Sequence, residues 1–118
     1  GSKIIALHKG RYFQVSEGLQ IDSGAFIKAI EYATSTTSEV VGKPEKAFFE
    51  LALKDMDLAP EESIMIGDDI INDVEGAQLA GVKGVLVKTG KYRKDLVEKS
   101  NIEPDLIISS INEIIKYL

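Results

Sequence analysis

From residue 39 onward, the chain alternates short apolar runs with segments in which apolar residues recur at helical spacing. The apolar runs cover residues 39–42, 63–66, 82–88 and 106–108. The helix-like segments that follow them cover residues 44–56, 74–80, 94–99 and 111–118. Because a helix between two strands returns the chain to the same end of a sheet, this alternation favours parallel strands. It predicts an α/β fold with a Rossmann-like parallel sheet and flanking helices.

The residues before this alternation follow a different pattern. We expect a strand at residues 3–7, a hairpin over residues 10–21 and a helix over residues 24–33. Residues 34–38, Thr-Ser-Thr-Thr-Ser, are polar and without periodicity, which is typical of a linker. We therefore divide the chain into residues 1–34 and 35–118, and we interpret Gly1-Ser2 as an expression scar.

Three aspartates follow the apolar run at residues 63–66. Asp68 and Asp69 come directly after Gly67, and Asp73 follows four residues later. In open parallel sheets, ligands bind beyond the carboxyl ends of the strands, where we expect these side chains to lie. Carboxylate oxygens are hard ligands of the kind that Mg²⁺ binds together with water and phosphate oxygens. The turn is therefore a candidate magnesium site; the alternative is that Asp73 only caps the next helix.

A lysine occupies the corresponding position after the preceding strand. Lys43 lies between the run at residues 39–42 and Pro44, which is suited to the first turn of a helix. At the same sheet edge as the acids, it would pair with Asp68 or Asp69 and contact a phosphoryl group as a point charge. The alternative is a solvated loop lysine. Together, the lysine and the carboxylates favour phosphoryl chemistry.

The composition excludes several other kinds of site. The 118 residues contain no cysteine and one histidine, His8, which excludes disulfides, thiolate catalysis and metal sites built from several histidines. The net charge of −5 disfavours a broad basic surface, so we expect no nucleic-acid partner. No apolar run approaches the ~18 residues that a membrane span requires, so we expect no membrane partner.

Two longer segments resemble the third and fourth motifs of the haloacid dehalogenase superfamily, within its subclass IIA phosphatases. They are Val40-Val41-Gly42-Lys43-Pro44-Glu45-Lys46-Ala47-Phe48-Phe49 and Met65-Ile66-Gly67-Asp68-Asp69-Ile70-Ile71-Asn72-Asp73-Val74-Glu75-Gly76-Ala77. Residues 3–34 resemble the end of the cap that this group inserts into its core. The resemblance implies a Rossmann-like core preceded by the end of an α/β cap.

The resemblance also implies an activity and roles for the residues. It implies Mg²⁺-dependent hydrolysis, through an aspartyl-phosphate, of phosphate monoesters, phosphoamino acids or pyrophosphate by a cytoplasmic enzyme. Lys43 would orient the nucleophile and stabilise the phosphoryl charge. Asp68 would bind Mg²⁺, and Asp73 and Asp69 would support the metal directly or through water.

One motif of the family is missing. The Asp-x-Asp-Gly segment that carries the nucleophile does not occur in the 118 residues. We therefore expect the chain to be the C-terminal portion of such an enzyme, inactive alone, and to cover its exposed surface as a homodimer or swapped assembly. The alternatives are a non-catalytic binding or regulatory domain of the same fold and a phospho-acceptor switch domain. The order of the motifs disfavours the switch domain.

Overall fold

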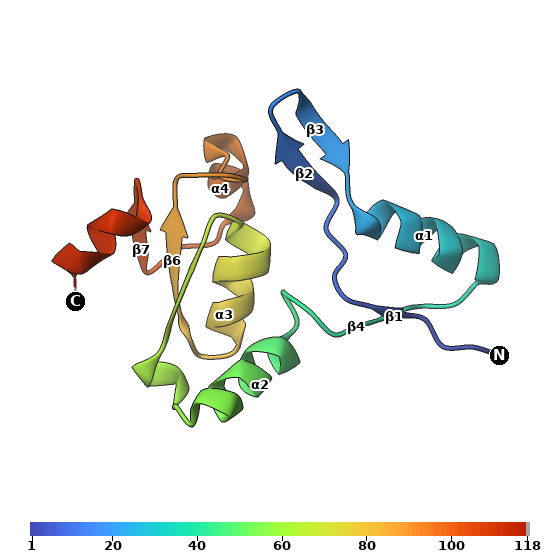
Figure 1. The fold of residues 1–118 in the computed structure, drawn as a ribbon, viewed down its shortest axis with the longest axis horizontal. Helices are drawn as coiled ribbons and strands as arrows, with labels where there is room; N and C mark the ends of the chain where they lie inside the picture. Colours follow the sequence, from blue (N-terminus) through green and yellow to red (C-terminus); the bar gives the residue numbers. More distant parts are fainter. Residues whose placement is uncertain (118) are drawn as a thin grey trace.

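The computed structural model describes residues 1–117, which form two parts joined by a pair of crossing segments (Figure 1). The N-terminal part consists of β1 (Ile5–Ala6), β2 (Tyr12–Val15), β3 (Gly18–Ile21), α1 (Ser23–Thr34) and β4 (Glu39–Val40). β2 and β3 pair antiparallel, with Tyr12 opposite Ile21, as the hairpin pattern predicted. Helix α1 begins after Asp22, whose carboxylate accepts a hydrogen bond from the Ser23 amide at 2.6 Å. The two chain termini lie at opposite ends of the molecule.

The second part contains the predicted alternation of helices and strands. Its elements are α2 (Lys46–Met56), η1 (Pro60–Glu62), β5 (Ile64–Gly67), η2 (Ile70–Glu75), α3 (Gly76–Leu79), β6 (Lys83–Val87), α4 (Lys94–Ser100), β7 (Leu106–Ile108) and η3 (Ile111–Lys116). Strands β5, β6 and β7 form one sheet in that order, with Gly67 opposite Leu86 and Leu86 opposite Ile107. Both pairs are parallel, which confirms the predicted α/β class.

The central strand β6 divides the core into two faces, since successive side chains point to opposite sides of a sheet. Leu86 packs with Ile70 and Val74 on the face covered by η2 and by side chains from the α4 region. Val85 and Val87 pack with Ile108 on the other face, where Ile114 of η3 lies against them. A third cluster joins α2 to α3 through Phe49, Leu53, Ala77, Ala80 and Val82. Packing on both faces therefore holds the sheet in place beneath the loops at its carboxyl edge.

The prediction that the strand after the linker joins the main sheet is wrong. β4 pairs in parallel with β1, and the amides of Glu39 and Val41 donate to the carbonyls of Ile4 and Ala6 at 2.9 and 3.0 Å. These bonds satisfy the backbone of the short strand away from β5. Within residues 1–117, β5 therefore pairs with β6 on one side only.

Two helices also differ from their sequence-based description. The segment expected to become helical at residue 74 already turns at Ile70, as a π-helix that continues into α3. The reason is that Asp69, not Asp73, caps it by accepting from the amides of Ile71 and Asn72. The terminal helix is a 3₁₀-helix, and Leu118 lies outside the described residues. Across residues 1–117, none of the helices combines the length and apolar character needed to cross a membrane.

Candidate active site

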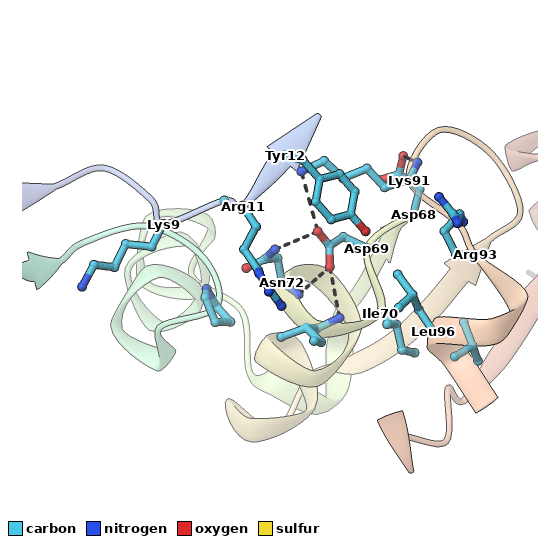
Figure 2. Close-up of a pocket in the computed structure, with 14 residues that line it drawn as sticks. Lys9, Arg11, Tyr12, Asp68, Asp69, Ile70, Asn72, Lys91, Arg93 and Leu96 are labelled. Carbon is cyan, nitrogen blue, oxygen red and sulfur yellow. Dashed lines mark hydrogen bonds and ion pairs between the residues drawn. The ribbon is translucent and has the colours of Figure 1, made fainter. Parts of the chain in front are cut away.

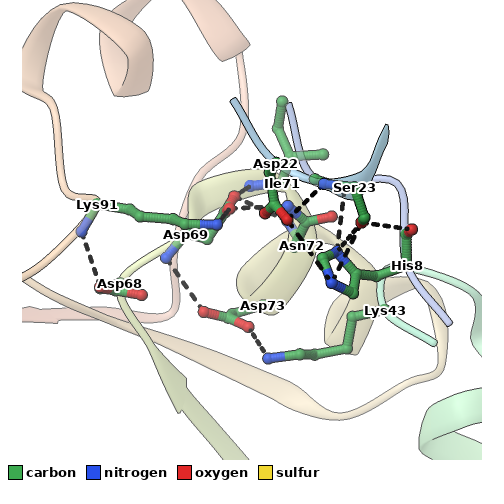
Figure 3. A network of polar contacts seen from close by, with 11 residues as sticks. His8, Asp22, Ser23, Lys43, Asp68, Asp69, Ile71, Asn72, Asp73 and Lys91 are labelled. Carbon is green, nitrogen blue, oxygen red and sulfur yellow. Dashed lines mark hydrogen bonds and ion pairs between the residues drawn. The ribbon is translucent and has the colours of Figure 1, made fainter. Parts of the chain in front are cut away.

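Lys43 and Asp73 form a close ion pair at the carboxyl edge of β5. The Lys43 Nζ donates to Asp73 Oδ1 at 2.6 Å, and the carboxylate is 6% exposed against 36% for the lysine side chain (Figure 3). The two residues are brought together from the segment after β4 and from η2, as the shared edge predicted. The partner differs from the expectation, because Lys43 pairs with Asp73 and with neither Asp68 nor Asp69. Asp73 thus holds the ammonium group in a defined position.

Gly67 makes room for this pair. A β-carbon at this position would overlap the carboxylate and the β-carbon of Asp73. The close approach lets Asp73 Oδ2 accept a hydrogen bond from the Asp69 amide at 3.1 Å, while Oδ1 accepts from Lys43. The buried carboxylate therefore has a donor for each oxygen, which offsets the cost of removing it from water.

Asp69 fixes the turn. Its Oδ1 accepts from the amides of Ile71 and Asn72 at 3.2 and 3.0 Å, and its Oδ2 accepts from the Asn72 side-chain amide at 2.7 Å. The Lys91 Nζ lies 3.7 Å from the same Oδ2. Both oxygens of Asp69 therefore accept hydrogen bonds that hold the start of η2.

Asp68 faces the loop that follows β6. Its Oδ2 accepts from the Lys91 amide at 2.8 Å. Gly90 has φ +49°, and a β-carbon there would overlap the Asp68 carboxylate, so glycine is required for this approach. The segment that follows β6 therefore lies at the same edge as the acids. The other oxygen, Oδ1, receives no hydrogen bond from residues 1–117.

A cavity of about 480 Å³ opens beside Asp68 and Asp69 (Figure 2). Its walls come from both parts of the molecule, because Arg11 and Tyr12 of the hairpin face Lys91 and nearby residues of the β6–α4 loop across it. The sequence predicted a hairpin over residues 10–21 but gave no sign that Arg11 and Tyr12 line a cavity. Only the packing of the hairpin against the sheet edge brings them to the cavity, and no local motif signals that packing.

The acidic turn offers few free donors to a cation. Within residues 1–117, no group of three or more carboxylate or imidazole side chains is arranged to hold a metal ion by itself. Asp68 carries the one carboxylate of the turn with an oxygen free of hydrogen bonds to described residues. A hard cation fits such an oxygen as one ligand among several.

An Asp-x-Asp spacing does occur once, at Asp55-Met56-Asp57, but it has no relation to this edge. It is followed by Leu58 in place of glycine, and it ends helix α2, where Asp57 has φ +54°. A residue at a helix C-terminus does not project from the carboxyl end of a strand, so these aspartates do not belong to the candidate site.

Known hydrolases resemble this chain in sequence. A sequence profile described as HAD-hydrolase-like matches residues 40–114, more than half of the chain. The mouse haloacid dehalogenase-like hydrolase domain-containing protein 2 is 50% identical over 118 residues, which cover 100% of this chain and 46% of that protein. The zebrafish (Danio rerio) phospholysine phosphohistidine inorganic pyrophosphate phosphatase is 51% identical over 90 residues, covering 76% of this chain and 33% of that protein.

Solved structures of phosphatases share the fold of this chain. The p-nitrophenyl phosphatase from Archaeoglobus fulgidus superposes with a TM-score of 0.87 at 27% identity, covering 98% of this chain and 46% of that one. The chain spans about half the length, or less, of the curated relatives it matches. The profile match and the level of identity lead to one conclusion: the chain belongs to the haloacid dehalogenase-like hydrolase family.

Proposed function

We propose that this chain supplies the phosphate- and metal-binding half of a Mg²⁺-dependent phosphatase site. The observation that carries the proposal is the Lys43–Asp73 pair at 2.6 Å, at the same sheet edge as Asp68. A fixed ammonium group and a carboxylate oxygen without a hydrogen bond to described residues, both at one sheet edge, suit a phosphoryl group and the cation that accompanies it.

Each residue has a distinct role in this proposal. Lys43 binds the transferring phosphoryl group and stabilises its charge, and Asp73 positions Lys43 through the buried ion pair. Asp68 is the metal ligand of this chain, through the oxygen that no described residue engages. Asp69 supports the site by holding the turn that presents Asp68. Bound Mg²⁺ would supply neutralisation and orientation of the phosphoryl oxygens.

The nucleophile is proposed to come from outside this sequence. The 118 residues contain no Asp-x-Asp-Gly, and the relatives are about twice as long as the chain. The unpaired edge of β5 lies next to the site and is suited to receive a further parallel strand. We propose that such a strand brings the nucleophilic aspartate beside Lys43, so that hydrolysis proceeds through an aspartyl-phosphate. The 118 residues alone are then inactive.

The substrate class rests on the relatives. Their names refer to phosphatases of phospholysine, phosphohistidine, pyrophosphate and nitrophenyl phosphate. We propose that the complete protein hydrolyses small phosphorylated compounds of this range: phosphate monoesters, phosphoamino acids or pyrophosphate. The cavity of about 480 Å³ beside Asp68 has the size of a small-molecule site.

The test is turnover of p-nitrophenyl phosphate with Mg²⁺ by the protein expressed from its complete reading frame. We expect Asp68→Asn and Lys43→Met each to lower kcat by about 100-fold or more, and a chelator to abolish turnover. The matched control is Glu50→Gln, which removes a carboxylate from an exposed pair with Lys46 on α2. Turnover that is unchanged in Asp68→Asn would contradict the metal role, and no turnover in the unmodified protein would favour a non-catalytic domain.

We further propose that the 118 residues alone self-associate as a homodimer or swapped assembly. Ile21, Phe26 and Leu51 are 65–68% exposed, so both parts present apolar side chains to solvent. The check is sedimentation of the purified chain over a range of concentrations. A monomer at every concentration would contradict this proposal.

A further inference from the structure

The cavity beside Asp68 is lined unevenly by charge. Asp68 and Asp69 lie on the side of the β5–η2 turn, and four cationic side chains lie around the rest of the cavity: Lys9, Arg11, Lys91 and Arg93. The lining thus has more positive than negative groups, although the chain as a whole has a net charge of −5. A local excess of positive charge in a negative molecule attracts anions to this place in particular.

The two lysines pair with carboxylates that are less exposed than the partner of Arg93. The Lys9 Nζ donates to the buried Glu31 at 2.5 Å, so its charge is directed away from any ligand. The Lys91 Nζ lies 3.7 Å from Asp69 Oδ2; a dashed line marks this contact in Figure 2. These two lysines are therefore less available than the arginines to bind an anionic ligand in the cavity.

The two arginines differ from the lysines. Arg11 forms no ion pair with any residue in 1–117, and Arg93 has one long contact of 3.7 Å with Asp95, whose side chain is 56% exposed. Exposed pairs at this distance contribute little, so both guanidinium groups are available. The planar fork of a guanidinium group matches the two oxygens of a carboxylate or phosphate.

The arginines belong to the two segments that face each other across the cavity. Arg11 precedes β2 in the N-terminal part, and Arg93 precedes α4 in the second part. Ile70, Leu96 and Val97 add apolar side chains to the lining, and Tyr12 lies beside Asp69. A ligand whose phosphoryl group sits at Asp68 would therefore contact apolar side chains as it extends towards the arginines.

We propose that this cavity selects substrates whose leaving group carries its own negative charge, either a carboxylate or a second phosphate, which Arg11 and Arg93 bind. The inference rests on the proposed phosphatase function and narrows its substrates. Phosphorylated acids and pyrophosphate are favoured over esters of neutral alcohols of the same size. Binding the second anion fixes the direction in which the leaving group departs from the phosphoryl group.

Three substrates test the proposal in the protein expressed from its complete reading frame: ethyl phosphate, carboxymethyl phosphate and pyrophosphate. The readout is the ratio of kcat/KM for each anionic substrate to that for ethyl phosphate. We expect Arg11→Gln with Arg93→Gln to lower at least one ratio by about tenfold, since each change removes charge-assisted hydrogen bonds. The carboxylate and phosphate ratios show which second anion is the one recognised. The control is Lys94→Gln, which removes an exposed charge from outside the cavity.

A binding measurement separates this inference from the proposed reaction. Calorimetry with methylphosphonate, phosphonoacetate and methylenebisphosphonate requires no turnover. We expect phosphonoacetate, methylenebisphosphonate or both, which carry a second anionic group, to bind more tightly than methylphosphonate. We expect the arginine variants to remove this difference. Equal binding of all three, or a preference that survives in the arginine variants, would overturn the inference. Absence of turnover with a retained arginine-dependent preference would instead overturn the hydrolysis and leave an anion-binding cavity.

Discussion

The two parts of the molecule are held together by different forces. In residues 46–117, buried apolar side chains from α2, η2, α3, β6 and β7 form three clusters, and partly buried Met65 and Ile66 of β5 pack against two of them. In residues 1–40, Ala6 is the one apolar side chain that is buried, and larger ones such as Ile21 and Phe26 are exposed. The second part therefore has a hydrophobic core of its own, whereas the first part depends on polar contacts.

The main polar contact of the first part is a cluster around Glu31. This carboxylate is 7% exposed and accepts hydrogen bonds from the Ser38 amide and hydroxyl, both at 2.8 Å, and from Lys9 and Lys28. Lys9 and Ser38 lie on the two segments that connect the parts. The cluster thus fixes how α1 sits on the crossing segments, and the position of Arg11 beside the site depends on it.

The largest contrast is expected from removing the same side chain in each part. Leu86 is fully buried, so Leu86→Ala should lower the free energy of unfolding by about 2–5 kcal/mol through lost burial and a cavity. Leu19 is 52% exposed, so Leu19→Ala should change it by less than about 1 kcal/mol. Urea unfolding of the purified chain measures both. Similar losses in the two variants would contradict the conclusion that only the second part has a hydrophobic core.

A smaller loss is expected at the junction of core and site. Gly67→Ala would push a methyl group into Asp73 and should lower the free energy of unfolding by about 1–3 kcal/mol. Since Asp73 holds Lys43, the variant should also disturb the Lys43 side-chain resonances in an NMR spectrum. A stable protein with unchanged Lys43 resonances would show that the close approach is not required.

Much of this fold could be predicted, because it depends on local patterns. The apolar runs that became β5, β6 and β7 are bounded by clear turn residues, and their alternation with helices specifies parallel pairing. The pairing of β4 with β1 could not be predicted in the same way. Both strands have two residues, and the bonds that join them connect segments more than thirty positions apart.

The sequence predicted which residues would lie near one another, but it did not predict their contacts. It placed Lys43 after one strand and the three aspartates of residues 68–73 after the next, at one sheet edge. It did not indicate which acid pairs with Lys43, because the choice depends on the π-helical turn that directs Asp73 back towards Gly67. The helical pattern of apolar residues contains no signal for a π-turn.

The polar cluster gives the first part a specific dependence on pH. Hydrogen bonds from Lys28, Lys9 and Ser38 hold the pKa of Glu31 well below its usual value of 4.5. A carboxyl group whose pKa is lowered by folding contributes stability above its unfolded pKa and loses it as the pH falls towards the folded one. Glu31→Gln should therefore destabilise the protein at pH 7, and its difference from wild type should shrink below about pH 4.5.

Amide hydrogen exchange at Ser38 measures this effect locally. We expect faster exchange of the Ser38 amide in Glu31→Gln at neutral pH, with little change at the amide of Leu86 in the hydrophobic core. Equal changes at both amides would show that the two parts unfold as one unit. That result would contradict the conclusion that polar contacts stabilise the first part separately from the hydrophobic core.

The smallest effect is expected from the outer lysine of the cluster. The Lys28 Nζ lies 2.8 Å from Glu31 Oε2, and the Lys28 side chain is 73% exposed. The Lys9 side chain is only 24% exposed. Exposed ion pairs are screened by water and salt, so Lys28→Met should change the free energy of unfolding by about 0.5 kcal/mol or less. Lys9→Met should change it more and should accelerate exchange at Ser38, because it removes the partner that joins α1 to the first crossing segment. An equal loss from both lysines would mean that net charge near Glu31, and not the inner contact, secures the first part.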